Sequence, residues 1–209
     1  MLTSFSADPQ SAINADRSGG ISESGAYVGV LKQAETYVTQ NGAQMMRFWF
    51  ATKDGQETWT DLCVLKKDGT AAWGLDLFNS MMVCMGVQAA DATPGRARQR
   101  NGQINENAMR IRNVENKPIG LLLQRENDTY QDQKTLEWKP TYRMNIVRAF
   151  DPVTRKTASE MLQNKEAHNI ENALKTLKDK DRKPEQGSRP AAPAHAVAQA
   201  APQDDDFPW

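Results

Sequence analysis

The sequence predicts a mainly β protein with one small folded domain and a long polar C-terminal segment. Three observations support this prediction: apolar residues alternate in several short segments, Asn-Gly and Asp-Gly pairs separate these segments, and one central segment has helical spacing. The chain has 209 residues, of which 39% are hydrophobic, which is enough for one core but low for a fully globular chain. We therefore expect one domain of ordinary size with appendages.

The first three predicted strands follow one another closely. Alternating apolar residues predict a strand over residues 27–38, and Asn41-Gly42 is the pair that a tight hairpin turn prefers. A second strand is predicted over residues 44–52. Asp54-Gly55 then predicts another hairpin, followed by a third strand over residues 57–65 that is rich in Trp, Thr, Val and Leu. These three strands predict a meander.

One helix and two further strands complete the predicted domain. Apolar residues within 73–85 follow helical spacing, and Gly86 stands where such a helix would end. Residues 119–124 and 142–150 predict two more strands, joined by the polar residues around 125–128. The order strand, strand, strand, helix, strand, strand is that of the OB-fold, a five-stranded, partly open barrel that binds oligonucleotides. Other small barrels share the meander.

Composition divides the chain into four parts. Residues 1–24 are polar and rich in Gly and Ser, and we expect a flexible N-terminal arm. Residues 25–150 contain the predicted barrel, and residues 151–183 contain an interrupted apolar stripe that predicts a C-terminal helix capped by Ser159. Residues 184–209 combine a Pro- and Ala-rich linker with an acidic tip, so we expect them to be disordered.

The formal net charge of zero conceals an uneven distribution. Residues 1–95 carry six Lys or Arg and ten Asp or Glu, whereas residues 96–150 carry eleven and six. Local basic charge is typical of a surface that binds nucleic acid. Cys63 and Cys84 lie in apolar context without a CxxC motif, which indicates reduced core thiols in the cytoplasm. We expect neither secretion nor membrane insertion.

Strand alternation separates core side chains from those of the outer face, because successive side chains point to opposite sides of a strand. On the second strand the expected core set is Met46, Phe48 and Phe50. Arg47 and Trp49 are then expected on the outer face, where the ring can stack on a base and the guanidinium can meet a phosphate. The alternative is that Trp49 packs inward, because a bulge or a register slip would turn it over.

The same reasoning assigns the side chains of the other strands. The expected inward set is Val28, Val30, Leu62, Val64, Tyr142, Met144 and Ile146. The expected outward set is Tyr27, Trp59, Asp61, Arg143 and Asn145. Tyr27, Trp49 and Trp59 would then line one platform for bases. We therefore predict DNA contacts from Tyr27, Trp59 and Arg143 as well as from the second strand.

Residues 87–118 show no clear period and carry a cluster of arginines at alternate positions. These are Arg96, Arg98, Arg100, Arg110 and Arg112. In an extended segment, alternate side chains share a face and can follow a phosphate backbone. Asn101-Gly102 would form a turn between two arms and so make a basic finger beside the barrel. The alternative is a merely solvated loop, although a segment this long without its own core is usually functional or disordered.

No sequence motif indicates catalysis. The chain lacks GxxxxGK[ST], GxSxG and HExxH, and it has no carboxylate cluster suited to two metal ions. Local backbone chemistry explains the polar residues at the predicted turns, which are Asp54, Asp68, Asn101 and Asn127. We therefore predict no catalytic residue, no metal site and no cofactor, and we expect that the protein is not an enzyme.

The C-terminal tip is the most specific signal in the sequence. It consists of Asp204, Asp205, Asp206, Phe207, Pro208 and Trp209. Three adjacent carboxylates stay in water and the aromatic residues beside them have no core to enter, so we expect a partner to capture the tip. A generic solvated acidic tail is the alternative. The tip resembles the tail of bacterial and phage single-stranded DNA-binding proteins, with Trp209 where those tails usually end in Phe.

A phage OB-fold family of such proteins opens with a strand that is similar to Gly25-Ala26-Tyr27-Val28-Gly29-Val30-Leu31-Lys32-Gln33-Ala34-Glu35. The resemblance implies a protein that coats and protects single-stranded DNA in replication, recombination or repair and recruits a helicase, polymerase or nuclease through its tip. It implies the host cytoplasm for a phage-encoded chain and is compatible with a homo-oligomer. The arginine segment and residues 157–180 depart from the minimal barrel pattern.

Other functions remain open from the residues alone. The barrel could act as a recombination mediator or adaptor that binds proteins, which failure to bind oligonucleotides would indicate. It could also bind duplex DNA or RNA, because OB-folds accept many nucleic acids, and competition between single-stranded and duplex DNA would separate these. A nuclease is a more distant alternative, which incubation of labelled DNA with Mg²⁺ or Mn²⁺ would reveal.

Overall fold

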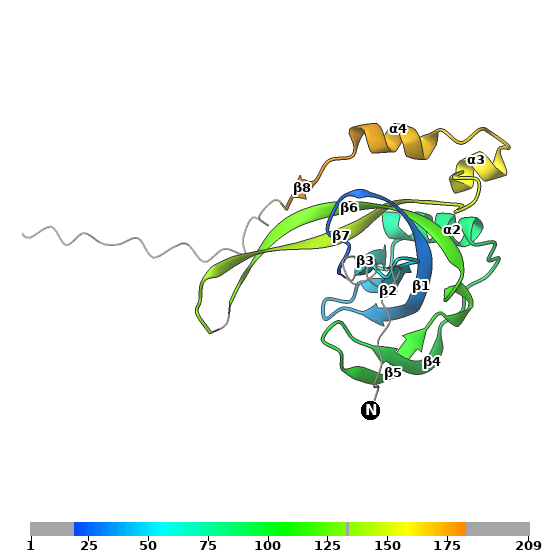
Figure 1. Ribbon diagram of the computed structural model, residues 1–209. Helices are drawn as coiled ribbons and strands as arrows, with labels where there is room; N and C mark the ends of the chain where they lie inside the picture. The colour runs from blue at the N-terminus through cyan, green and yellow to red at the C-terminus, as the bar shows by residue number, and fades with distance from the viewer. Residues whose placement is uncertain (1–18, 133, 183–209) are drawn as a thin grey trace, which may run out of the picture.

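The computed structural model describes residues 19–132 and 134–182 and shows a mainly β architecture with few helices (Figure 1). The strands are β1 (Gly25–Val38), β2 (Gln44–Thr52), β3 (Glu57–Leu65), β4 (Thr93–Arg98), β5 (Ile104–Arg110), β6 (Pro118–Gln131), β7 (Trp138–Phe150) and β8 (Lys180–Asp181). The helical segments are α2 (Trp73–Cys84), the 3-10 turn η1 (Arg112–Val114), α3 (Ala158–Leu162) and α4 (Asn169–Thr176). The strand ladders are antiparallel, except that β8 runs parallel to β6.

Strand β1 is the centre of the sheet because it pairs with three other strands. Its C-terminal half lies against β2 and β5, and its N-terminal half lies against β6, so that it curves through the fold (Figure 1). Gly29 has a partner on each side, Thr52 of β2 and Ile119 of β6. A Cβ atom at Gly29 would lie 2.1 Å from the carbonyl oxygen of Ala51. Glycine therefore permits the close approach of β1 and β2 at this point.

The strands and the helix predicted for the domain correspond to β1, β2, β3, α2, β6 and β7. Strand β3 pairs with β2 and β7 pairs with β6, but no ladder joins β3 to β7 within the described residues. The antiparallel sheet is therefore open along this line, and backbone pairing does not close it into a five-stranded barrel. Helix α2 lies against both β3 and β7 beside the opening.

The core lies between the concave side of the sheet and α2. The rings of Phe48 on β2 and Phe78 on α2 are stacked with their centroids 6.0 Å apart. Met81, Leu121 and Ile146 are fully buried around them. Burial of these apolar side chains provides the main driving force that joins the helix to the sheet.

Residues 19–24 belong to this folded unit rather than to a flexible arm. Ile21 is only 1% exposed and packs in the core. Gly20 forms a parallel bridge with Glu57 at the start of β3. The sequence does not reveal this segment because one apolar residue among Gly and Ser gives no periodic signal. The remainder of the expected arm, residues 1–18, lies outside the described residues.

Residues 87–118, expected to lack regular structure, contain β4, β5 and η1. The two strands form a hairpin whose turn includes Gly102 at φ 84°, as Asn101-Gly102 predicts. Ala97 and Ala108 are the fully buried residues of the two strands. The alternation of apolar and polar residues that reveals a strand is therefore absent from this segment.

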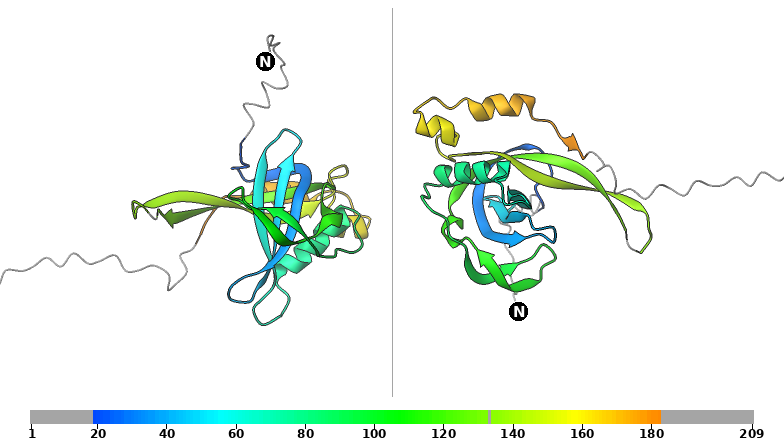
Figure 2. Two further views of the ribbon diagram at one scale, coloured as in Figure 1. Left: turned by 90° about the horizontal axis from the view of Figure 1, so that it is seen from below. Right: turned by 180° about the vertical axis from the view of Figure 1, so that it is seen from behind.

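Strands β6 and β7 continue beyond the core as a two-stranded arm (Figures 1 and 2). Residues 125–128, expected to connect two strands, lie inside β6. Cross-strand ion pairs hold the arm together: Arg143 Nη2 lies 2.8 Å from Glu126 Oε1, and Lys139 Nζ lies 2.5 Å from Asp132 Oδ2. Opposite charges on facing strands stabilise such a ribbon without a buried face, so its polar sequence lacks the apolar alternation that predicts a strand.

The expected C-terminal helix consists of two short helices, and Thr157 rather than Ser159 is the N-cap of α3. The carboxylate of Glu160 accepts hydrogen bonds from the backbone N–H groups of Thr157 at 2.8 Å, His168 at 2.8 Å and Asn169 at 2.7 Å. One buried side chain therefore joins α3 to the start of α4.

Helix α4 covers part of the outer side of the sheet (Figure 1). Its buried residue Ile170 packs against Leu122 of β6 and Phe150 of β7. The following strand β8 then pairs with β6 at the base of the arm.

We expect the substitution Glu160→Gln to destabilise the protein. Burial alone would raise the pKa of Glu160, but the backbone hydrogen bonds outweigh burial and lower the pKa to about 2. A group whose pKa falls on folding contributes its full stabilisation above its ordinary pKa of 4.5, and the contribution is lost as the pH falls toward about 2. At neutral pH the amide should cost about 2 kcal/mol in urea unfolding, because its NH₂ group cannot accept the hydrogen bonds.

The control for this prediction is Glu166→Gln, which removes a carboxylate that is 88% exposed and pairs with the ring of His168. This change should leave the free energy of unfolding nearly unaltered. The wild type should lose more stability than Glu160→Gln between pH 5 and pH 2. Equal stability of the wild type and Glu160→Gln at neutral pH would contradict the prediction.

Candidate nucleic-acid interface

The outer face of β2 and β3 carries the side chains that the alternation assigns to it. The buried side chains on these strands include Phe48, Phe50, Leu62 and Val64. The residues between them, Arg47, Trp49, Trp59 and Asp61, are half-buried and lie on the opposite face. The structure thus brings four of the expected outward residues together on two neighbouring strands.

Trp49 and Trp59 form a stacked pair on this face. They are direct partners in the β2–β3 ladder, and their ring centroids lie 5.4 Å apart with an interplanar angle of 13°. The indole N–H of Trp49 donates a hydrogen bond to Glu57 Oε2 at 3.0 Å. Because the rings share one face of the sheet and remain partly accessible, they form a rigid aromatic platform.

Tyr27 does not belong to this platform, so its predicted outward position is wrong. Its side chain packs against the core, its hydroxyl donates to the carbonyl of Glu23 at 2.9 Å, and burial raises its pKa. Val28, expected to point inward, is instead 43% exposed. A bulge between Leu31 and Gln33 shifts the phase of β1, so the N-terminal part of the strand has the reverse of the expected alternation.

Beyond the bulge β1 keeps the expected phase, and three of its residues that the sequence analysis did not propose as contacts lie on the outer face. Gln33 pairs with Trp49, Glu35 with Arg47, and Tyr37 with Met45, and paired residues share a face of the sheet. Tyr37 therefore supplies the β1 ring on this face, and the guanidinium of Arg47 lies 4.5 Å from its centroid. An alternation pattern alone gives no sign of the extra residue in β1.

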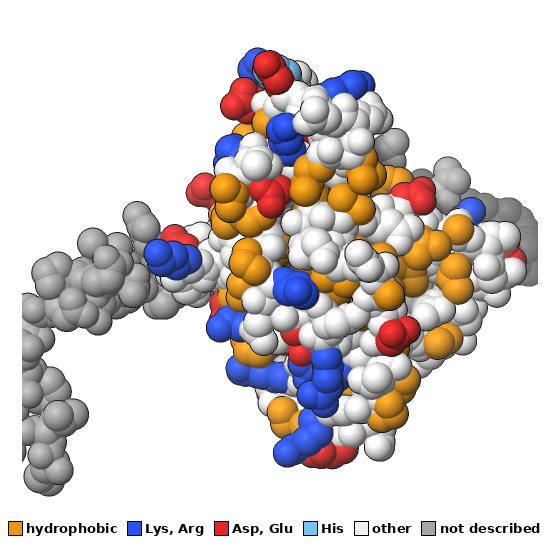
Figure 3. Space-filling view, turned by 90° about the vertical axis from the view of Figure 1, so that its right-hand side faces the viewer, with side chains coloured by type: hydrophobic (Ala, Val, Ile, Leu, Met, Phe, Trp, Pro, Cys, Tyr) orange, Lys and Arg blue, Asp and Glu red, His pale blue; other side chains and the backbone are white. Residues whose placement is uncertain are grey.

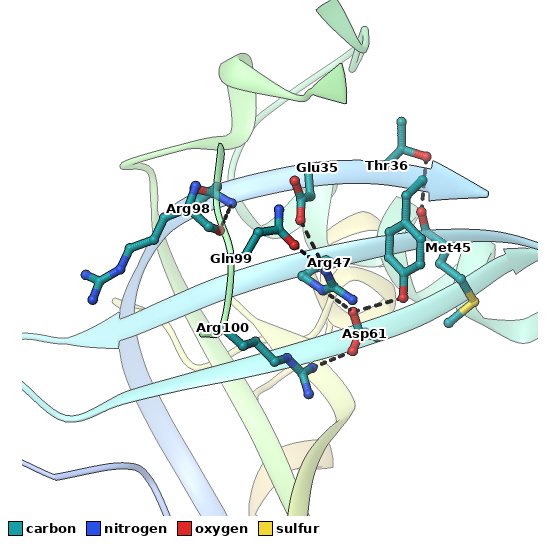
Figure 4. Close-up of polar contacts among 10 residues, drawn as sticks. Glu35, Thr36, Met45, Arg47, Asp61, Arg98, Gln99 and Arg100 are labelled. Carbon is teal, nitrogen blue, oxygen red and sulfur yellow. Dashed lines mark hydrogen bonds and ion pairs between the residues drawn. The ribbon is translucent and has the colours of Figure 1, made fainter. Parts of the chain in front are cut away.

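A charged network crosses β1, β2 and β3 in the row of residues next to the platform (Figure 4). Arg47 Nε donates to Asp61 Oδ1 at 2.9 Å, and Arg47 Nη1 lies 3.5 Å from Glu35 Oε1. Burial raises the pKa of Glu35, although the nearby guanidinium groups partly oppose this effect. Burial alone would lower the pKa of Arg47, but Asp61 raises it overall, so Arg47 remains charged. Tyr37 Oη donates to Asp61 Oδ1 at 3.3 Å.

The β4–β5 hairpin crosses this face and places Arg98 and Arg100 on it (Figure 4). The side chain of Gln33 holds the backbone of Arg98 by two hydrogen bonds of 2.9 Å, one donated and one accepted. The guanidinium of Arg98 lies 5.1 Å from the centroid of Trp49, and that of Arg100 forms an ion pair with Asp61. The hairpin is thus the basic finger that the arginine spacing predicts.

The other arginines of this segment are used differently. Arg96 pairs with Glu106 across the same hairpin at 2.7 Å. Arg110 points to Glu115 at 2.6 Å with its side chain only 14% exposed, and its backbone pairs with Glu35 of β1. Arg112 lies in η1. Arg110 therefore anchors the base of the hairpin, whereas Arg98 contacts Trp49 and Arg100 contacts Asp61 on the outer face of β2 and β3.

Arg143 lies on the β6–β7 arm, where Glu126 accepts hydrogen bonds from it at 2.8 and 3.2 Å. Hydrogen bonding from Arg143 lowers the pKa of Glu126. Tyr142, expected in the core, is 39% exposed and lies beneath the guanidinium of Arg125 at 4.6 Å. Trp138 of the arm is 54% exposed. The arm extends past the end of the core, so its alternating residues have no core to enter.

Basic side chains gather at the end of the molecule where β4 and β5 lie, in the lower part of Figure 3.

A groove of about 430 Å³ lies between β3 and β7, where the sheet is open. Its lining includes Asp61 and Cys63 of β3, Trp73 of α2, Asn145 of β7 and Lys180 of β8. Asp61 thus lies at the border between the platform and this groove.

Comparison of the chain with models of known protein families and with curated proteins found no match.

Within the described residues, no group of three or more His, Cys, Asp or Glu side chains could hold a metal ion. Burial raises the pKa of the Cys84 thiol to about 11. No helix in residues 19–132 and 134–182 is long and apolar enough to cross a membrane. The expected partner-binding residues 204–209 lie outside the described residues.

Proposed function

We propose that the protein binds single-stranded DNA on the outer face of β1, β2 and β3, beneath the β4–β5 hairpin. The observation that carries this proposal is the stacked pair of Trp49 and Trp59 with Arg47, Arg98 and Arg100 around it. An aromatic platform bordered by guanidinium groups is suited to a single strand, because bases stack on the rings and phosphates meet the cations. Such binding tolerates any sequence, since every base has a π-face.

The strand order supports a related fold proposal. Strands β1, β2, β3, β6 and β7, with α2 between β3 and β6, follow the order of an OB-fold. In this interpretation the β4–β5 hairpin is an insertion after α2, and α3 and α4 are additions beyond the barrel. We propose an OB-type domain related to phage single-stranded DNA-binding proteins, with the groove between β3 and β7 as its unpaired seam.

In the proposed role the protein coats and protects single-stranded DNA during replication, recombination or repair. It acts in the cytoplasm by binding rather than by catalysis, alone or as a homo-oligomer. The tip at residues 204–209 recruits a replication or recombination enzyme such as a helicase, polymerase or nuclease. The composition of the tip supports this part of the proposal, since three adjacent carboxylates beside aromatic residues would suit a partner pocket rimmed by Lys or Arg.

The test is a titration of the full chain with oligo-dT of about 30 nucleotides, followed by intrinsic tryptophan fluorescence and by a mobility assay. We expect stoichiometric quenching, a preference over duplex of the same length, and weaker binding at higher salt. Absence of binding in both assays would overturn the proposal. The adaptor function would then be favoured, because Trp73 at 62% and Leu162 at 75% exposure border a second groove between α2 and α3.

A further inference from the structure

The carboxylate of Asp61 is an anion that lies between two arginines, Arg47 and Arg100. Its Oδ1 atom accepts from Arg47 Nε at 2.9 Å and from Tyr37 Oη at 3.3 Å, while its Oδ2 atom pairs with Arg100 (Figure 4). The carboxylate side chain is 23% exposed. Guanidinium groups and a phenol hydroxyl recognise phosphate oxygens with the same geometry that they use for carboxylate oxygens.

This anion lies next to the aromatic platform. Arg47 and Asp61 are one facing pair of the β2–β3 ladder, and Trp49 and Trp59 are the next pair on the same face. Two residues along a strand span about 7 Å. A nucleotide whose base stacks on the rings would therefore bring a phosphate within reach of the position that Asp61 fills.

Asp61 also holds the hairpin on the sheet. Arg100 reaches Asp61 from the hairpin, Gln99 Oε1 accepts from Arg47 Nη1 at 3.2 Å, and Arg98 lies over Trp49. Arg98 thus takes a place on the ring that a base would need. The described contacts between residues 98–100 and the face are polar or cation–π contacts, which a nucleic acid can replace with contacts of the same kind.

We propose that Asp61 is a competitor built into the strand-binding face: it mimics a phosphate, keeps the hairpin closed in the DNA-free protein, and is displaced when a strand binds. This inference rests on the proposed function. In the free protein Asp61 then neutralises the guanidinium groups at this position. Mononucleotides and other ligands with a single phosphate therefore gain little binding free energy from them. A strand that offers several phosphates and bases together opens the hairpin and releases Arg47 and Arg100 to the backbone.

The test compares the full chain with its Asp61→Asn variant in binding to oligo-dT of about 30 nucleotides over a series of salt concentrations. The amide is nearly the same size and keeps an acceptor oxygen, but it carries no charge. We expect Asp61→Asn to bind about tenfold more tightly at low salt, with the slope of log K against log salt steeper by about 0.7 for each additional phosphate neutralised. Affinity equal to or below that of the wild type, with the fold retained, would overturn the inference.

Glu106→Gln is the matched control, because it removes one negative charge from the same hairpin at a site that is 60% exposed and paired only with Arg96 among the described residues. This variant should bind less than about threefold more tightly than the wild type, since exposed charges are screened. A gain equal to that of Asp61→Asn would show a general charge effect and would overturn the assigned role of Asp61.

Hydrogen exchange of the DNA-free proteins tests the closed hairpin separately. Amides of residues 98–103 should exchange faster in Asp61→Asn than in the wild type, and unchanged exchange would overturn the closing role. If the wild type binds oligo-dT and Asp61→Asn binds no more tightly, this inference fails alone. If neither protein binds, the proposed function fails with it.

Discussion

Replacing Trp49 with alanine is expected to lower the affinity for oligo-dT by about 10- to 100-fold, because each base stacked on an aromatic side chain contributes about 1–3 kcal/mol. Trp49 is central to the platform, since it stacks on Trp59 and supports Arg98. Its loss removes one stacking surface and leaves Trp59 without its neighbour. Fluorescence anisotropy of a labelled oligonucleotide measures this effect independently of the tryptophans.

The control is Trp73→Ala, which removes a ring that is 62% exposed on α2 and lines the groove beyond Asp61 rather than the stacked pair. This variant should bind oligo-dT like the wild type. Trp49→Phe should recover part of the lost affinity, because phenylalanine keeps a stacking surface. If Trp49→Ala retains both its fold by circular dichroism and wild-type affinity, the platform does not bind the bases.

The substitution Gly29→Ala is expected to destabilise the protein by about 3 kcal/mol or more, because it forces an atom into a closely packed sheet. The new Cβ atom would lie 2.1 Å from the carbonyl oxygen of Ala51 and 2.9 Å from the ring of Phe50. The first of these neighbours is backbone and cannot move aside without separating β1 from β2. Urea unfolding followed by circular dichroism measures the loss.

Gly19→Ala provides the matched control, because no atom lies within 4 Å of the Cβ position there. This change should alter the free energy of unfolding by less than about 1 kcal/mol. If Gly29→Ala were as stable as Gly19→Ala, β1 and β2 would be able to separate locally without disturbing the core, and the close approach at Gly29 would have no structural role.

The strands that the sequence predicts well are those with one buried face. On β2, Phe48 and Phe50 alternate with Arg47 and Trp49, and the structure buries the first pair and places the second on the outer face. Asn41-Gly42 marks its boundary, since Gly42 has φ 87°. Alternation and turn chemistry report local physics, so they are readable without the rest of the fold.

The features that the sequence did not reveal depend on contacts with distant residues. The bulge between Leu31 and Gln33 shows no pattern of its own, yet it turns Tyr27 away from the outer face, whereas Tyr37 beyond the bulge stays on that face. The β4–β5 hairpin is stabilised by contacts such as Gln33 with Arg98, which are 65 positions apart. Pairing between such distant residues produces no periodic pattern in the sequence. The sequence therefore shows that the arginines cluster, but it does not show which of them reach the outer face of the sheet.

The pairing of β8 with β6 fixes the point from which the remainder of the chain departs. The backbone N–H of Arg182 donates to the carbonyl of Asn127 at 2.9 Å, and Arg182 also pairs with Asp128 at 2.7 Å. The 27 residues from position 183 to Trp209 can span at most about 95 Å from this anchor. Under the proposed function, an enzyme captured by the tip stays within that radius of the anchor on the DNA-bound domain. Capture therefore raises the enzyme's local concentration at the DNA without any contact between the enzyme and the folded domain.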